Sequence, residues 1–140
     1  MGKAPRAKKL RVPLWMSGFY GIFTFAMVPW IWHLLCTIPG EHMGMHWRLL
    51  WGVFDTVLFV NGFVVTYLLA KKSAWACLPL ATLATLFAMD MWFDYMTSVT
   101  AAERVAAVKI TIVAEIPLTI LTLSCAIYIL RQVTHRISQR

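Results

Sequence analysis

Four long apolar runs constrain the fold of this chain more than any other feature. They cover Leu14–Ile38, Trp47–Ala70, Ala74–Thr97 and Ile110–Leu130, and the connections between them are Pro39–His46, Lys71–Ser73 and Ser98–Lys109. About 20 residues of apolar helix are enough to cross a bilayer. Because backbone polar groups in lipid must be paired within the segment, helices are the spanning form to expect. The sequence therefore predicts an all-α integral membrane protein, built as a bundle of four transmembrane helices.

Composition supports this fold class and excludes others. The chain has 140 residues, of which 60% are hydrophobic and 14% are charged, whereas a soluble domain has about 45–50% apolar and about 25% charged residues. The net charge is +7, but the basic residues lie at the chain ends and in connections rather than on one folded face, so we expect no nucleic-acid partner. Cys36, Cys77 and Cys125 form no C-x-x-C pair, and they predict neither a disulfide framework nor a zinc site.

The first apolar run follows a basic segment, as a secretion signal does. It is longer than the apolar part of a signal peptide, which has about 7–15 residues, and Pro39-Gly40 is not a small-x-small cleavage site. We therefore expect it to stay as a membrane helix. The predicted organisation is a basic cytoplasmic tail (1–13), a transmembrane domain (14–130) and a second basic cytoplasmic tail (131–140).

The distribution of lysine and arginine predicts the orientation. Ten of the 13 basic residues lie before the first run, between the second and third, or after the fourth. The other three, Arg48, Arg104 and Lys109, lie on the opposite side. Since cytoplasmic loops carry the excess of lysine and arginine, both termini are predicted to be cytoplasmic.

Carboxylates inside the apolar runs are the main candidates for a site. Asp55, Asp90, Asp94 and Glu115 lie within the runs, and the alternating topology puts all four in the extracytoplasmic half, at a depth similar to that of His33. Charged side chains in a membrane span are costly and usually face the bundle interior or a watery cavity. The sequence therefore predicts that separate helices bring these groups to one layer.

Helical phase supports the convergence, at about 100° per residue. The polar positions of each run share a face with small residues, which helix contacts in lipid prefer. The four predicted faces are Gly18, Ile22, Ala26, Pro29, His33 and Thr37; Arg48, Gly52, Asp55, Phe59, Gly62 and Thr66; Leu83, Phe87, Asp90, Asp94 and Thr97; and Thr111, Glu115, Thr119, Thr122 and Ala126. The strip of Cys77, Ala81, Ala84 and Ala88 on the other side of the third run predicts a central helix or a protein partner.

The charges in this layer do not balance. Four carboxylates bring four negative charges, of which Arg48 offsets one and a protonated His33 one more. The carboxylates must therefore be protonated, hydrated or neutralised by a cation. A purely structural alternative pairs Arg48 with Asp55 or Glu115 and leaves the aspartates hydrated. Both interpretations remain open at the level of sequence.

Two further features bear on ligands. Pro29 and Pro117 lie in the same layer, where a kink beside Glu115 could open a cavity. His42 and His46 in the first connection are weak candidates for metal ligands, because imidazole and the neighbouring thioethers suit copper, and imidazole also suits zinc. The residue pattern names no cofactor.

Three segments carry a resemblance. His46-Trp47-Arg48 with Phe54-Asp55, then Asp90-Met91-Trp92-Phe93-Asp94, and then Ala114-Glu115-Ile116-Pro117-Leu118 resemble small four-span membrane proteins of actinobacteria. The D-x-W-F-D segment is the most specific part. The resemblance implies a multi-pass protein of a bacterial plasma membrane with the same topology. It implies no activity, cofactor or partner.

Three functions fit these observations. The first is a bundle that binds or transports a cation or a cationic substrate, with ligand-binding candidates Asp55, Asp90, Asp94, Glu115, Arg48 and His33. The second is an accessory or assembly subunit of a larger membrane complex. The third is an intramembrane acid–base enzyme with a lipid-like substrate, which a deep apolar cleft at Asp90 and Glu115 would favour. Since no nucleophile elbow, P-loop, zincin or Rossmann motif is present, we assign no catalytic residue. The bilayer is the expected partner, and a homodimer is the second possibility.

Overall fold

The computed structural model describes residues 10–38 and 46–138, and every regular element in these ranges is a helix. In chain order the elements are α1 (Leu14–Thr37), α2 (Trp47–Ala70), the short 3₁₀ turn η1 (Ala74–Ala76), α3 (Cys77–Thr97), α4 (Ala101–Ile110), the π-helical segment η2 (Thr111–Glu115) and α5 (Ile116–Ile137). The predicted all-α class is thus confirmed for the described part of the chain.

Four helices are long and apolar enough to cross a membrane. They are Leu14–Thr37, Trp47–Ala70, Ala74–Thr97 and Ala101–Ile137. The first three match the predicted runs to within one residue. They indicate a multi-pass membrane protein.

The predicted connection Ser98–Lys109 is wrong, because most of it forms helix α4. The Thr100 hydroxyl accepts a hydrogen bond from the Glu103 amide at 3.2 Å, and the Glu103 carboxylate accepts one from the Thr100 amide at 3.0 Å. This reciprocal capping box satisfies amides that a helix start otherwise leaves unpaired. The alanines of α4 have a high helix propensity. Lys109 in the last turn of α4 interacts favourably with the helix dipole.

The last helix is continuous from Ala101 to Ile137 but contains one wide turn. The Ile116 amide bonds to the Thr111 carbonyl, five residues earlier. Pro117 lacks the amide that would bond to Val113, so the widened turn lies where a regular hydrogen bond is already missing. Such π turns are often found at functional sites, and this one carries Glu115.

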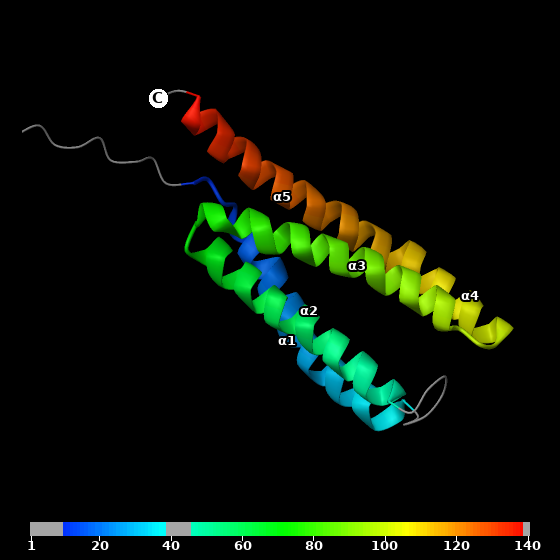
Figure 1. Ribbon diagram of the computed structural model, residues 1–140. Coiled ribbons are helices and arrows are strands. Elements are labelled where there is room, and N and C mark those ends of the chain that lie inside the picture. The colour runs from blue at the N-terminus through cyan, green and yellow to red at the C-terminus, as the bar shows by residue number, and fades with distance from the viewer. Residues whose placement is uncertain (1–9, 39–45, 139–140) are drawn as a thin grey trace, which may run out of the picture.

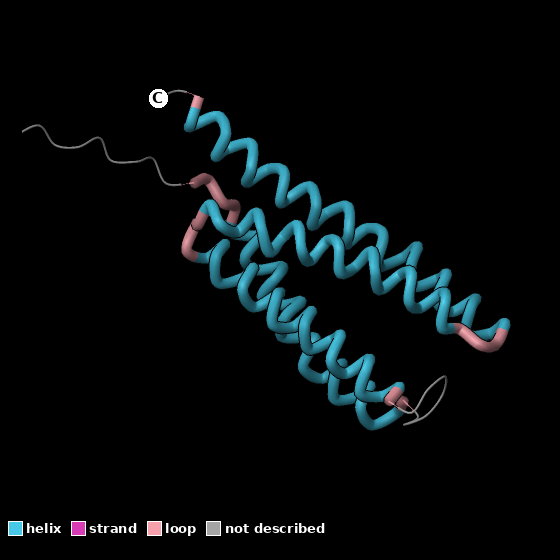
Figure 2. The backbone as a smooth tube through the Cα atoms, viewed as in Figure 1, coloured by secondary structure: helices cyan, strands magenta, loops and turns pink. Residues whose placement is uncertain are grey.

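The helices form two hairpins, α1 with α2 and α3 with α4–α5 (Figure 1). The hairpins lie together at the end that holds the α2–α3 turn, which we term the basal end. They diverge toward the opposite end, which we term the distal end and where α3 turns into α4 (Figure 2). α2 packs on α3, whereas α1 and α4 are not among the helix pairs in close contact.

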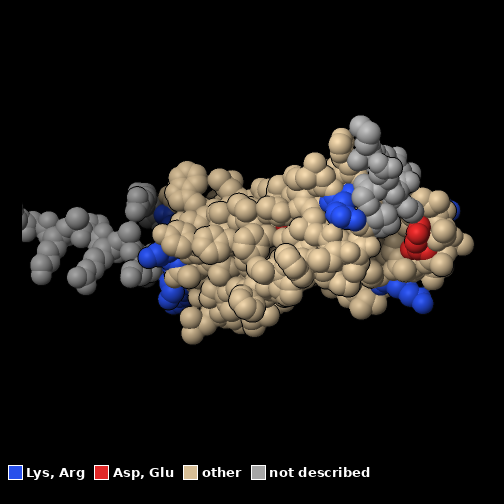
Figure 3. All heavy atoms as spheres, turned by 90° about the horizontal axis from the view of Figure 1, so that it is seen from below, with Lys and Arg blue, Asp and Glu red and all other residues tan. Residues whose placement is uncertain are grey.

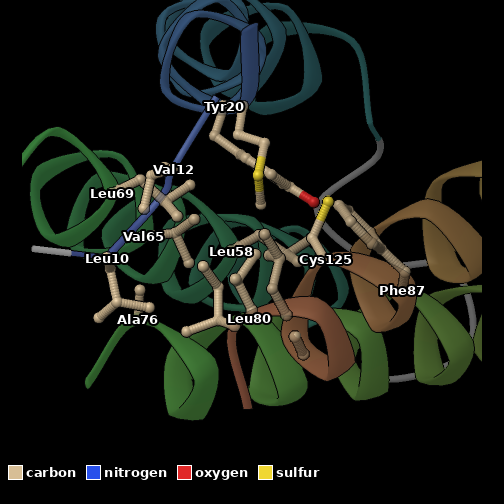
Figure 4. Close-up of a cluster of buried hydrophobic side chains, with 14 of the residues drawn as sticks. Leu10, Val12, Tyr20, Leu58, Val65, Leu69, Ala76, Leu80, Phe87 and Cys125 are labelled. Atoms are coloured by element: carbon tan, nitrogen blue, oxygen red, sulfur yellow. The ribbon is translucent and has the colours of Figure 1, made fainter. Parts of the chain in front are cut away.

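The apolar core lies mainly in the basal half, and Figure 4 shows side chains that belong to it. Val65, Leu80 and Ile129 come from three different helices and have no exposed surface. The Tyr20 hydroxyl donates a hydrogen bond to the Thr122 hydroxyl at 3.0 Å, and this bond joins α1 to α5. The two hairpins are therefore fixed to each other at the basal end, and the distal half is left free to hold a cavity.

Both predicted tails are partly structured. Leu10 and Val12 are buried in the core, and the Arg11 carbonyl between them accepts hydrogen bonds from Tyr128 and Gln132 of α5 at 3.1 and 2.9 Å. α5 continues to Ile137, past the predicted boundary at residue 130. The residues nearest the membrane domain thus belong to the bundle.

The predicted interior face of the first span is wrong. Its members Gly18, Ile22, Ala26, Pro29, His33 and Thr37 are all exposed. The buried face consists of Met16, Tyr20, Thr24, Met27 and Leu34. Because α1 is apolar on all sides, the spacing of its apolar residues does not show which side faces lipid and which side packs on the other helices. Its packing follows α2 instead, where Gly62 allows a close approach to Thr24.

Candidate functional site

A cavity of about 550 Å³ lies between the two hairpins in the distal half. Asp55 of α2, Asp90 and Asp94 of α3 and Glu115 of η2 all line it. The structure thus brings together the four carboxylates that the sequence placed in one layer. Their role in binding a ligand stays a prediction.

Asp55 is the most buried of the four carboxylates, with 4% of its surface exposed. The Trp30 indole N–H of α1 donates a hydrogen bond to its Oδ2 at 3.0 Å. A hydrogen bond to a buried carboxylate fixes the orientation of that group and offsets part of its desolvation. Trp30, which was not among the predicted site residues, is therefore part of the site.

Glu115 is held within its own π turn. It is 6% exposed, and its Oε2 accepts a hydrogen bond from the Thr111 hydroxyl at 2.7 Å. The neighbouring Thr119 hydroxyl is buried and has no hydrogen-bond partner among the described residues. The wide turn and one hydroxyl thus hold Glu115 at the cavity wall.

Asp90 and Asp94 lie one turn apart on α3 and are partly buried. In residues 10–38 and 46–138, no side chain donates a hydrogen bond to either carboxylate, and no lysine or arginine forms an ion pair with any of the four acids. The described chain therefore places no basic side chain against these four carboxylates.

Arg48 and His33 lie outside this cavity, although they were predicted to belong to the site. The Arg48 Nε donates to the Ile38 carbonyl at 2.8 Å. A helix C-terminus favours a cation there, and α1 ends at this point. His33 is exposed, with its ring centroid 6.2 Å from that of Trp30. Neither residue offsets the charge of the four carboxylates.

The predicted metal ligands receive no support. His42 lies outside the described residues, and His46 is exposed. The described residues contain no group of three His, Cys, Asp or Glu side chains arranged to hold one metal ion. The carboxylates share a cavity but are not gathered around a single point in it.

An apolar floor, which was not among the predicted features, lies beneath the carboxylates. Each spanning helix contributes one side chain, namely Phe23, Leu58, Phe87 and Leu118. Three of these follow a sequence signal, because each lies three residues from a carboxylate, on its basal side: Leu58 from Asp55, Phe87 from Asp90 and Leu118 from Glu115. Residues three apart on a helix share a face, so this spacing predicts an apolar layer directly below the acids.

Aromatic rings extend from the cavity wall to α3. Trp47 and Trp51 line the cavity, with ring centroids 5.8 Å apart in an edge-to-face arrangement. Phe54 continues the series from Trp51 to Phe93 of α3 at 6.1 and 6.2 Å. Edge-to-face contacts add to the burial energy of each ring, so this series joins the hairpins on the α2–α3 side of the cavity.

No protein family, curated protein or solved structure matches this chain. The resemblance to small actinobacterial membrane proteins therefore stays an expectation from the sequence.

Proposed function

We propose that this chain is a four-span membrane protein with its basal end in the cytoplasm. The proposal is supported by the belt of uncharged side chains between two ends where charged residues gather, visible on the face drawn in Figure 3. The basal end carries Lys71, Lys72, Arg131 and Arg136, in keeping with the excess of basic residues in cytoplasmic segments. A bacterial plasma membrane is the location that the resemblance implies.

We further propose that the cavity binds a cation. The single observation that carries this proposal is that Asp55, Asp90, Asp94 and Glu115, together with Glu103 of α4, line one cavity. No basic side chain of the described residues pairs with the first four of these carboxylates. Removing several like charges from water is costly unless an opposite charge compensates them. A bound cation supplies that charge.

The lining favours an organic cation over a single metal ion. Trp30, Trp47 and Trp51 are part of the wall, and indole faces attract cations, most strongly where water is excluded. The volume also lies within the range of pockets for small organic molecules, about 300–1,000 Å³. Binding is the function supported by this geometry. Transport requires in addition that the floor opens, and a dimer is one way to complete a pathway.

Thermal unfolding of the purified protein in lipid nanodiscs tests the proposal. Tetramethylammonium, tetraphenylphosphonium, Ca²⁺ and Zn²⁺ are each added at pH 8 and at pH 5. We expect at least one cation to raise the melting temperature at pH 8 and to do so less at pH 5, because a protonated carboxyl group no longer attracts a cation. Asp90→Asn should remove the effect.

Arg48→Gln is the matched control, because its side chain lies outside the cavity. It should keep the stabilisation seen in the wild type. If no cation stabilises the wild type at either pH, or if Asp90→Asn responds as the wild type does, the proposal fails.

The same cavity also supports an intramembrane acid–base enzyme. Apolar side chains surround Asp90 and Glu115, which is the arrangement that this hypothesis requires. Its substrate would be lipid-like and would not need a charge. Equal stabilisation by a neutral long-chain alcohol and by a cation would favour this second function.

The accessory-subunit hypothesis depends on the small-residue strip of α3. Ala81 and Ala88 of this strip are exposed, whereas Ala84 is buried. Close helix approach in lipid uses such positions. Co-purification in mild detergent tests it: a monomer without any associated protein would count against a larger complex.

A further inference from the structure

The distal cavity has two chemically different sides. The α1 side consists of Phe23, Met27, Trp30, Leu34 and Ile38. All five are apolar or aromatic, and the one polar group among their side chains, the Trp30 indole N–H, is already bonded to Asp55. The α1 side therefore has no free hydrogen-bonding group for an occupant.

The opposite side is polar and acidic. α3 contributes Asp90, Asp94 and Thr97, and η2 contributes Glu115. Ser98 and α4 complete this side, with Glu103 and the apolar Ala106, Ala107 and Ile110. The Glu103 carboxylate accepts hydrogen bonds from the Val99 and Thr100 amides. The Thr97 hydroxyl bonds to the Phe93 carbonyl, and Glu115 has the Thr111 hydroxyl as its partner. Asp90 and Asp94 are therefore the groups on this side that a positive charge can face directly.

The floor excludes a hydrated occupant from the deep end. Phe23 of α1 meets Phe87 of α3 edge to face, with ring centroids 5.4 Å apart, and Leu58 and Leu118 complete the layer. A small hydrated ion would leave this floor and the α1 side in contact with water, and burial of such surface is favourable by about 25 cal/mol per Å². An occupant with an apolar part covers it.

The cavity is not closed equally on all sides by packed helices. Phe54 and Phe93 connect α2 to α3, whereas α1 and α4 both line the cavity and are not among the helix pairs in close contact. For the ligand class proposed below, we therefore expect entry from the membrane between α1 and α4. An occupant that matches this cavity combines a charged group with an apolar part and can dissolve in lipid.

We propose that the ligand is an amphiphilic organic cation, an amine or quaternary ammonium that carries an apolar chain or ring system. This inference rests on the proposed cation-binding function and names its ligand class. The charged group faces Asp90 and Asp94, and the apolar part lies against α1 and the floor. The apolar part then contributes to affinity as much as the charge does.

Binding of a chain-length series separates this inference from the function on which it rests. The probes are tetramethylammonium, butyltrimethylammonium and octyltrimethylammonium, with octanol as the neutral probe. Binding to the protein in phosphatidylcholine nanodiscs at pH 8 is followed by tryptophan fluorescence, since Trp30, Trp47 and Trp51 line the cavity. Empty nanodiscs correct for uptake of each probe by the lipid.

We expect the octyl compound to bind at least about 10-fold more tightly than tetramethylammonium, because each buried CH₂ adds to binding. Leu34→Ala should weaken the octyl compound several-fold and leave tetramethylammonium unchanged. Ile22→Ala, on the exposed face of the same helix, should change neither. Rescue of octyl binding by Leu34→Met would show that apolar volume is what matters.

Other results of this binding series would separate failure of the amphiphile inference from failure of cation binding. Equal affinity across the cation series overturns the amphiphile inference and leaves cation binding intact. Failure of every cation to bind overturns both. If octanol binds as tightly as octyltrimethylammonium, the charge is not recognised, and both proposals fail in favour of a neutral lipid-like ligand.

Discussion

Single residues decide how the carboxylates of the cavity are held. Asp55 and Glu115 are almost fully buried, and each has one hydrogen-bond donor, Trp30 and Thr111 respectively. Asp90 and Asp94 are less buried and have no such donor in the described part of the chain. We infer a division of roles, in which the first two acids are fixed parts of the wall and the other two face the ligand.

Trp30→Phe tests the first half of this division. The substitution keeps an aromatic ring but removes the N–H that Asp55 accepts, so a buried carboxylate loses its donor. We expect a loss of about 1.5–3 kcal/mol of stability, typical of a hydrogen bond to a charged group. Thermal or denaturant unfolding measures it. Trp32→Phe on the exposed face of α1 is the control and should cost much less; equal losses would argue against the role of the indole bond.

Lys72 is the one described non-glycine residue with a positive φ, at 52°. It closes α2, where its amide bonds to the Leu69 carbonyl and the Ser73 amide bonds to the Leu68 carbonyl, both at 2.9 Å. Glycine is the usual residue at this position of the motif, and a side chain there costs about 1–2 kcal/mol. Lys72→Gly should therefore raise the melting temperature, by an amount equivalent to about 1 kcal/mol. Lys71→Gly, in the ordinary helical region, should not; a lower melting temperature for Lys72→Gly would contradict this account.

At the scale of elements, one glycine sets the distance between α1 and α2. A Cβ on Gly62 would lie 2.8 Å from the Thr24 hydroxyl, which is itself bonded to the Tyr20 carbonyl at 2.7 Å. Gly62→Ala must therefore displace a helix or break that bond, and we expect it to cost about 1–3 kcal/mol. A Cβ on Gly18 would meet nothing within 4 Å, so Gly18→Ala is the control. Unfolding in nanodiscs should order the variants accordingly, and similar stabilities would show that the helices are not close-packed here.

The start of α4 depends on its capping box. Thr100→Ala removes the acceptor of the Glu103 amide, and an N-cap of this kind is worth about 1 kcal/mol. We expect faster amide hydrogen exchange in the first turn of α4 and little change elsewhere. Thr85→Ala provides the comparison, since its hydroxyl bonds only to the Ala81 carbonyl on an exposed face. Unchanged exchange in the first turn of α4 would mean that the box does not hold this helix end.

The elements also show what the sequence could predict. Long apolar runs set the helices, so three spans were placed to within one residue, and the acids of α2 and α3 share faces that the 3.6-residue period predicts. The start of α4 was missed although Thr100-Ala101-Ala102-Glu103 is a capping-box pattern, because hydropathy alone defined the boundary. The face of α1 was not predictable from its own residues, since the contact surfaces of α2 determine which side packs.

At the scale of the whole molecule, the two halves of the bundle differ. The basal half has a close-packed core that includes Leu10 and Val12, and a buried hydrogen bond from Tyr20 to Thr122 crosses it. The distal half holds the cavity with its carboxylates, and the apolar floor of the cavity is the distal edge of the core. A bundle joined at one end and open at the other provides a fixed base beneath a binding site.

The proposed binding depends on the attraction between the carboxylates of α3 and a positively charged ligand. The most direct test is equilibrium binding of octyltrimethylammonium at pH 8 to the wild type and to the double variant Asp90→Asn/Asp94→Asn, both in nanodiscs and both checked for folding by circular dichroism. We expect saturable binding to the wild type and an affinity at least about 10-fold lower in the double variant, equivalent to about 1.4 kcal/mol. Equal affinity of the two folded proteins would contradict it.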